Sequence, residues 1–159
     1  IKEMQAETQK QISKTNKQLS NLSSKWGEFV EYIVEPGLVE AFREREIFLS
    51  QVYKRAKAQL GAETLEIDLL AVNTDYVVLV EVKSSLSKDD VDQEIEHLHD
   101  FPRFFPEYAN RKILGAVAGI IMPDNIKKYA YHKGLFVLGQ SGETIKILND
   151  PKFQPKTAW

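Results

Sequence analysis

Two runs of strand-forming residues place the strongest constraint on the fold of this chain. Residues 64–72 and 76–83 are rich in β-branched residues and leucine, and an Asn-Thr-Asp segment at residues 73–75 separates them. Such polar residues favour tight turns because their side chains hydrogen-bond the nearby backbone. The pattern therefore predicts an antiparallel hairpin. Residues 77–80 are continuously apolar, which places the second strand in the interior of a sheet.

Three charged residues are expected at one level of this hairpin. Asp68 lies six residues before Thr74 and Glu81 lies seven after it, so the turn brings both carboxylates to about the same height, beside Lys83. Two carboxylates about 4 Å apart repel by roughly 4 kcal/mol at an effective dielectric of 20. A proton, the lysine or a divalent cation must offset this repulsion. An ion pair on an exposed hairpin and a Mg²⁺ or Mn²⁺ site both satisfy that condition.

The rest of the chain alternates between helical and strand patterns in its second half. We therefore predict a mixed α/β fold with helices on both faces of the sheet. The expected elements, in chain order, are a helix over residues 23–35 that Pro36 and Gly37 interrupt, strands over 46–57, 64–72 and 76–83, a helix that opens at a capping box over 87–90, a strand over 112–122, a helix over 123–132, and strands over 135–139 and 144–148.

The charged residues of the hairpin also carry a family resemblance. Asp68, twelve intervening residues and then Glu81-Val82-Lys83 resemble the core motif of the PD-(D/E)XK nuclease superfamily, with Ile67 at the position of the family's proline. The resemblance implies that Asp68 and Glu81 hold Mg²⁺ or Mn²⁺ with help from the Val82 carbonyl, and that Lys83 activates water. This superfamily includes restriction enzymes, Holliday-junction resolvases and repair nucleases.

The resemblance also implies a fold and a domain organisation. It predicts a restriction-endonuclease-like mixed β-sheet flanked by helices, in the order αβββαβ with an extra helix and strands. The similarity covers residues 23–159 and is to a bacterial branch often preceded by coiled-coil leaders. Residues 1–24 are polar with a heptad-like spacing, and we expect a helical leader there, either the end of a coiled coil or a frayed helix. The nuclease-like domain is then expected over residues 25–159.

A third acidic residue is expected from the first helix. Many family members carry a glutamate four residues after a glycine there, and Gly27 and Glu31 fit this spacing. A helical wheel supports the same choice, because Glu31 lies beside the apolar stripe of residues 26–34 whereas Glu28 points away from it. We expect Glu31 to support the metal or the water, with a solvent-exposed helix charge as the alternative.

Other residues have weaker indications of a role. Glu66 is a candidate auxiliary acid or a surface charge, and Gln93 is a candidate because some relatives use a glutamine or lysine from that helix. The histidines show no paired metal-ligand spacing, so helix-surface or interface roles are expected for them. The basic residues of the first strand are expected either to meet phosphates or to be solvated: Lys54, Arg55 and Lys57.

Composition narrows the function class. The chain contains no cysteine, which excludes disulfides, cysteine-ligated metal sites and a thiol nucleophile. No apolar stretch approaches the roughly 18 residues of a membrane helix, and we expect a cytoplasmic protein with no membrane partner. The net charge of −2 gives no global sign of nucleic-acid binding, although residues 1–25 carry five lysines and two glutamates.

The resemblance, together with these patterns, implies a Mg²⁺-dependent nuclease that hydrolyses phosphodiester bonds of DNA, or else of RNA. The alternative is a catalytically silent module that has the nuclease fold and serves nucleic-acid binding or coiled-coil-mediated assembly. A homo-oligomer formed through the N-terminal helix is a further expectation. A small-molecule enzyme has little support, because the sequence has neither a glycine-rich phosphate loop nor a G-x-S-x-G elbow.

Overall fold

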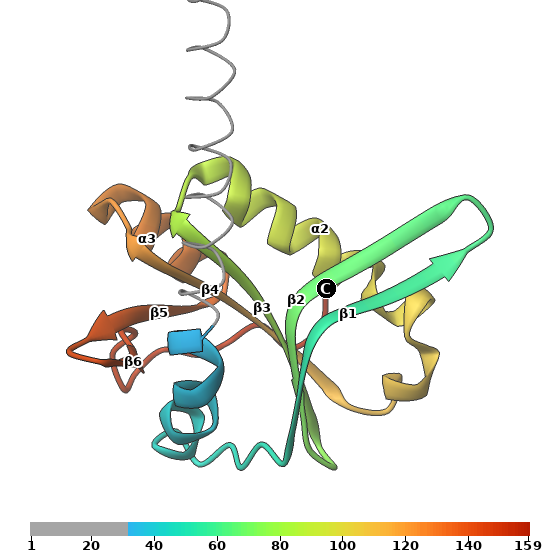
Figure 1. Ribbon diagram of the computed structural model, residues 1–159, viewed down its shortest axis with the longest axis horizontal. Helices are drawn as coiled ribbons and strands as arrows, with labels where there is room; N and C mark the ends of the chain where they lie inside the picture. Colours follow the sequence, from blue (N-terminus) through green and yellow to red (C-terminus); the bar gives the residue numbers. More distant parts are fainter. Residues whose placement is uncertain (1–31) are drawn as a thin grey trace, which may run out of the picture.

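A computed structural model describes residues 32–159 of the chain, and their centre is one six-stranded sheet (Figure 1). The strands lie side by side in chain order. They are β1 (Gln51–Leu60), β2 (Glu63–Val72), β3 (Tyr76–Ser85), β4 (Lys112–Ile121), β5 (Phe136–Ser141) and β6 (Thr144–Ile147). The helices are a segment over residues 32–43, α2 (Lys88–Phe104) and α3 (Asp124–His132), with a 3-10 turn at Pro106–Tyr108.

The sheet is mixed, as the sequence predicts. Strands β1, β2 and β3 are antiparallel neighbours, β3, β4 and β5 are parallel, and β6 is antiparallel to β5. The predicted order of a helix, three strands, a helix and a strand, followed by one more helix and two strands, is confirmed. The predicted long N-terminal helix and the boundary between residues 24 and 25 lie outside the described residues.

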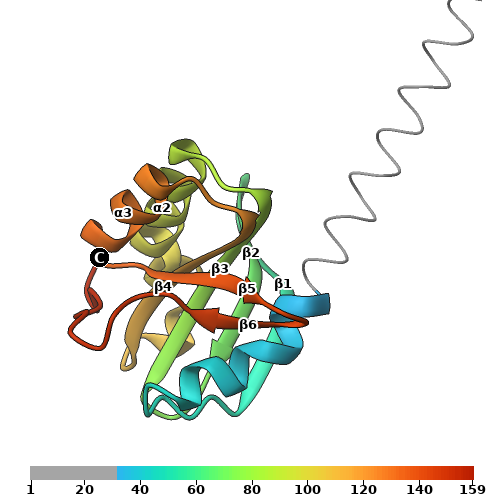
Figure 2. The same cartoon turned by 90° about the vertical axis from the view of Figure 1, so that its left-hand side faces the viewer.

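Two hydrophobic cores hold the sheet between helices. On one face, the helix over residues 32–43 packs against apolar residues of β2 to β6. On the other face, α2 and α3 cover a second cluster. Figure 2 shows this arrangement edge-on, with the early helix on one side of the sheet and α2 and α3 on the other. The interior strands β3 and β4 are therefore buried on both faces, which explains their continuous apolar runs.

The helix over residues 32–43 runs through Pro36 and Gly37, so the predicted interruption there is wrong. Proline lacks an N–H and costs the helix one backbone hydrogen bond. Burial of Leu38 and Phe42, which are fully inaccessible to solvent, outweighs that cost. Gly37 is needed because the helix lies so close to β6 that a Cβ at this position would come within 2.8 Å of Ile145 Cγ1.

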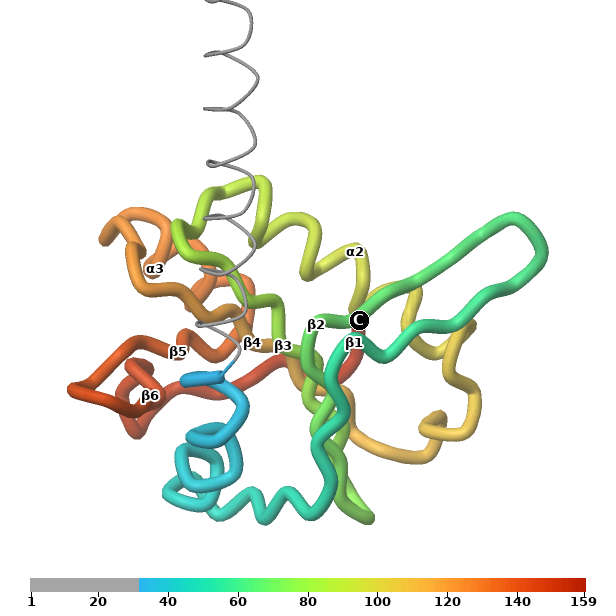
Figure 3. The backbone as a smooth tube through the Cα atoms, in the orientation of Figure 1, coloured from blue at the N-terminus to red at the C-terminus, as the bar shows by residue number. Residues whose placement is uncertain are grey.

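The first strand begins later than its composition suggests. The predicted range of 46–57 is observed as Gln51–Leu60, because pairing with β2 sets the ends of β1. Gly61, with a φ of 61°, forms the turn between the two strands. Figure 3 shows that this hairpin projects from the body of the molecule. Within residues 32–159, no helix combines the length and the apolar character needed to cross a bilayer.

Candidate functional site

The site lies where β2 and β3 separate. These strands pair from Val72↔Val77 to Leu69↔Val80, and the register pairs stop there. Beyond this point β2 continues beside β1, while β3 continues beside β4 as far as Ser85↔Ile121. The two ribbons diverge in Figure 1. Backbone groups of β3 that face the opening need partners other than β2.

Asp68 lies at the point of divergence and provides one such partner. The Val82 N–H donates to Asp68 Oδ2 at 2.9 Å, which ties the side chain of β2 to the backbone of β3. Burial raises the pKa of Asp68, and the Val82 hydrogen bond and the charge of Lys83 oppose that rise. Asp68 is therefore fixed next to Glu81 and Lys83, at the level that the hairpin spacing predicts.

A bend in the hairpin coincides with Asp68. Opposite it on β1, Arg55 is missing from the register between Lys54↔Leu69 and Ala56↔Ile67, and its φ of 52° is left-handed. Side-chain alternation changes across this bend. Leu69 packs with the helix over residues 32–43, whereas Ile67 packs on the α2 face. Residues two apart in a regular strand share a face, so the strand alternation that predicts a common face for Ile67 and Leu69 fails at this bend.

Glu81 and Lys83 bring the second carboxylate and the amine. Glu81 is only 5% exposed, and Lys83 Nζ lies 3.5 Å from Glu81 Oε1, while the Lys83 side chain is 40% exposed. Burial and then the charge of Asp68 raise the pKa of Glu81 to about 7, against the opposing effect of Lys83. Glu81 is therefore about half protonated at neutral pH when no cation is bound.

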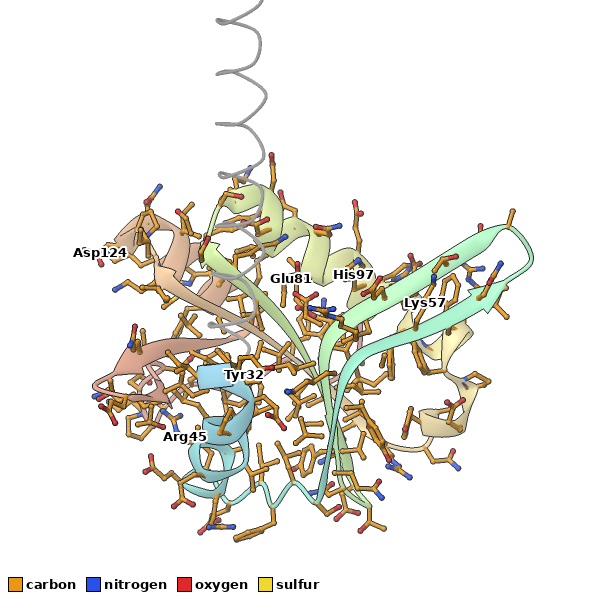
Figure 4. The ribbon with its side chains drawn as sticks, viewed as in Figure 1. Tyr32, Arg45, Lys57, Glu81, His97 and Asp124 are labelled. Atoms are coloured by element: carbon orange, nitrogen blue, oxygen red, sulfur yellow. The ribbon has the colours of Figure 1, made fainter. Side chains whose placement is uncertain are left out.

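Helix α2 adds two residues that the sequence analysis did not assign to the site. His97 Nδ1 lies 3.9 Å from Glu81 Oε2, and the labelled side chains meet beneath α2 in Figure 4. Burial lowers the pKa of His97. Glu94 is 1% exposed, and its Oε1 has no hydrogen-bond partner. Burial, followed by the charges of Glu81 and Asp68, raises the pKa of Glu94 well above its usual value.

A sequence signal for Glu94 did exist. Its spacing from Val91, Leu98 and Phe101 follows the helical repeat, so it stands at a buried position of an otherwise apolar stripe. The capping box of Ser87 and Asp90 that fixes the start of this helix is confirmed.

The remaining predicted residues are not tested by these contacts. Glu66 is exposed on the β1–β2 hairpin, opposite Lys57, and its charge contributes to the raised pKa of Asp68. Gln93 is exposed one helical turn before His97. Glu31 lies outside the described residues. The roles suggested for all three stay predictions.

The donor set suits a hard divalent cation. Mg²⁺ is typically held by one or two carboxylates together with waters and substrate phosphates, and Asp68 and Glu81 offer such carboxylates. Their charges also act on Glu94, whose Oε1 has no hydrogen-bond partner. Among residues 32–159, no group of three or more acidic or histidine side chains forms a ready-made cation site. The residues therefore fit a cation that keeps much of its water.

Comparisons with known proteins give partial likenesses. No protein-family model matches the sequence, and no curated protein matches it. A repair endonuclease from Pyrococcus abyssi is 20% identical, with a TM-score of 0.45, over 63% of this chain and 42% of that chain. The structure of EndoMS in complex with dsDNA is 16% identical, with a TM-score of 0.41, over 68% of this chain and 44% of that chain.

A third solved structure, the protein of unknown function AF1548, is 14% identical with a TM-score of 0.47. It is matched over 64% of this chain and 54% of its own. The chain thus spans about half the length of the structures it resembles. Because these TM-scores lie below 0.5, the geometry of the site carries the functional case.

Proposed function

We propose that the protein is a divalent-metal-dependent nuclease that hydrolyses phosphodiester bonds, with DNA as the favoured substrate. One observation carries this proposal. Asp68 of β2 is bonded to the backbone of β3 beside Glu81 and Lys83, at the level where the two strands part. Two carboxylates and one amine thus converge at an opening of the sheet. RNA remains the second choice of substrate.

In this proposal Asp68 and Glu81 hold the cation. The N–H and C=O of a strand residue point to the same side, so the carbonyl of Val82 faces the opening as its N–H does and offers a third oxygen. Bound Mg²⁺ or Mn²⁺ would supply the positive charge that stabilises the pentavalent phosphate. Glu31, if it reaches this site, adds another carboxylate.

Lys83 is assigned to the attacking water. Its ammonium group has three donors and lies 3.5 Å from Glu81 Oε1, so it hydrogen-bonds the carboxylate and retains donors for water or phosphate oxygen. The half-exposed position of the side chain leaves it accessible to a substrate in the opening. Its neutral form would accept the proton of the water.

Cleavage assays on the full chain test this function. Duplex, nicked, branched and single-stranded DNA and RNA are incubated with Mg²⁺ or Mn²⁺. We expect metal-dependent cleavage of DNA that falls at least about 100-fold in Asp68→Asn and in Lys83→Ala. Lys146→Ala is the matched control, because Lys146 is an exposed lysine on β6 at the opposite edge of the sheet.

Two results would contradict the proposal. Cleavage that persists in the Asp68→Asn/Lys83→Ala double variant belongs to a contaminant. Absence of cleavage on every substrate, together with no response to Mn²⁺, favours the catalytically silent alternative. Deletion of residues 1–24 then separates its two forms, because loss of oligomers supports an assembly module and unchanged nucleic-acid binding supports a binding module.

A further inference from the structure

We infer that Glu94 of α2 is the third carboxylate of the cation site. Its unpartnered oxygen would bind the cation that Asp68 and Glu81 hold, either directly or through one of its waters. This inference rests on the proposed function. It assigns a role to a residue outside the D…ExK pattern, from a different element of the fold.

The burial of Glu94 is the first argument. The side chain is 1% exposed and its Oε1 has no hydrogen-bond partner. A buried carboxyl group without a full set of hydrogen-bond partners destabilises the fold, so it is unfavourable at a position that only packs. Its neighbours in the stripe, Val91 and Leu98, are fully buried apolar residues. Leucine or methionine would fill the same position without that cost.

The direction of the side chain is the second argument. Helix α2 packs on β3, and the charges of Glu81 and then Asp68 act on Glu94, which places its carboxyl group near both acids. One turn further along α2, His97 reaches the other side of Glu81, with Nδ1 3.9 Å from Oε2. The same face of α2 thus presents both Glu94 and His97 toward Glu81.

The charge balance of the cluster is the third argument. Asp68, Glu81 and Glu94 come from β2, β3 and α2. The charge of Asp68 raises the pKa of Glu81, and the charges of Glu81 and Asp68 both raise the pKa of Glu94. Lys83 offsets part of this negative charge from the exposed side. A divalent cation would offset the remainder, since hard cations prefer carboxylate oxygen.

Binding of Mn²⁺ alone tests this role. Titration calorimetry and the Mn²⁺-induced rise in melting temperature are measured for the wild-type chain, Glu94→Gln and Glu96→Gln. The Glu96 variant is a matched control, because it removes the same charge from an exposed position of the same helix. We expect Glu94→Gln to fold with a melting temperature at least equal to that of the wild type without metal. We also expect its affinity for Mn²⁺ to fall about 10- to 100-fold, with Glu96→Gln unchanged.

Each other result is decisive. Wild-type affinity in Glu94→Gln, in a chain that binds Mn²⁺, would make Glu94 a structural residue and overturn only this inference. Absence of Mn²⁺ binding by the wild-type chain would overturn the proposed function and this inference with it. If Glu94→Gln does not fold, Glu94→Leu removes the buried polar group altogether. A folded Leu variant with weak Mn²⁺ binding supports the inference, and failure of both variants to fold would show that Glu94 maintains the fold.

Discussion

At the scale of single residues, Glu81 is the carboxyl group whose ionisation the site opposes most clearly. It is nearly inaccessible to solvent, and both burial and the charge of Asp68 disfavour its ionised form. Lys83 and His97 approach its two oxygens without removing that cost. In the proposed function, a bound cation would relieve the repulsion between the carboxylates that folding imposes.

This cost predicts how stability changes with pH. The unfolded chain releases the Glu81 proton near its usual pKa of 4.5, and the folded chain releases it at about 7. Between these values the folded state binds more protons, so the free energy of unfolding falls as pH rises, by on the order of a few kcal/mol. Urea denaturation without metal at pH 5 and pH 7.5 measures the fall. Glu81→Gln should show a smaller fall, and equal falls in both chains would contradict the pKa assignment.

Spacing along the hairpin was sufficient to predict that Asp68, Glu81 and Lys83 lie together. It could not reveal Glu94 and His97, because their approach to Glu81 depends on how α2 folds back over the sheet. The helical repeat did single out Glu94, because a glutamate is rarely found at a buried position of an apolar stripe unless it has a partner or a function.

At the scale of elements, the bend at Arg55 and Asp68 positions the site. A regular hairpin would keep Ile67 and Leu69 on one face, and the sequence pattern could show no exception to that rule. The left-handed φ of Arg55 changes the path of β1, and β2 follows it away from β3. Local backbone geometry at one residue thus opens the sheet beside Asp68.

The bend predicts a difference between two small residues at position 55. Arg55→Gly and Arg55→Ala both remove the side chain, but only glycine adopts a left-handed φ without steric cost. We expect the glycine variant to be more stable than the alanine variant by about 1 kcal/mol, measured by urea denaturation. A more stable alanine variant would show that residue 55 does not hold this conformation.

Other elements show what sequence patterns determine locally. The capping box begins α2 where the pattern predicts, because its hydrogen bonds involve only neighbouring residues. The predicted interruption at Pro36 and Gly37 is wrong, because the helix is stabilised by burial against the sheet, and that burial depends on residues far along the chain. The order of helices and strands along the chain could be predicted from their patterns, whereas the order of the strands within the sheet is known only from the structure.

At the scale of the whole molecule, β3 joins two kinds of sheet. It pairs antiparallel with β2 and parallel with β4, and β4 remains beside it after β2 has left. The chain then turns into α2, which packs back on β3 and β4 and brings Glu94 and His97 over the opening. The site is thus flanked on one side by the parallel strands β3 and β4 and on the other by the projecting β1–β2 hairpin.

The central claim is that Asp68 and Glu81 share a divalent cation, and a crystal grown or soaked with Mn²⁺ tests it most directly. An anomalous difference map should show a peak between the two carboxylates in the wild-type chain, and the peak should be absent in Asp68→Asn. A saturating concentration of Mn²⁺ that leaves this position without a peak, or that places the ion elsewhere, would contradict the account.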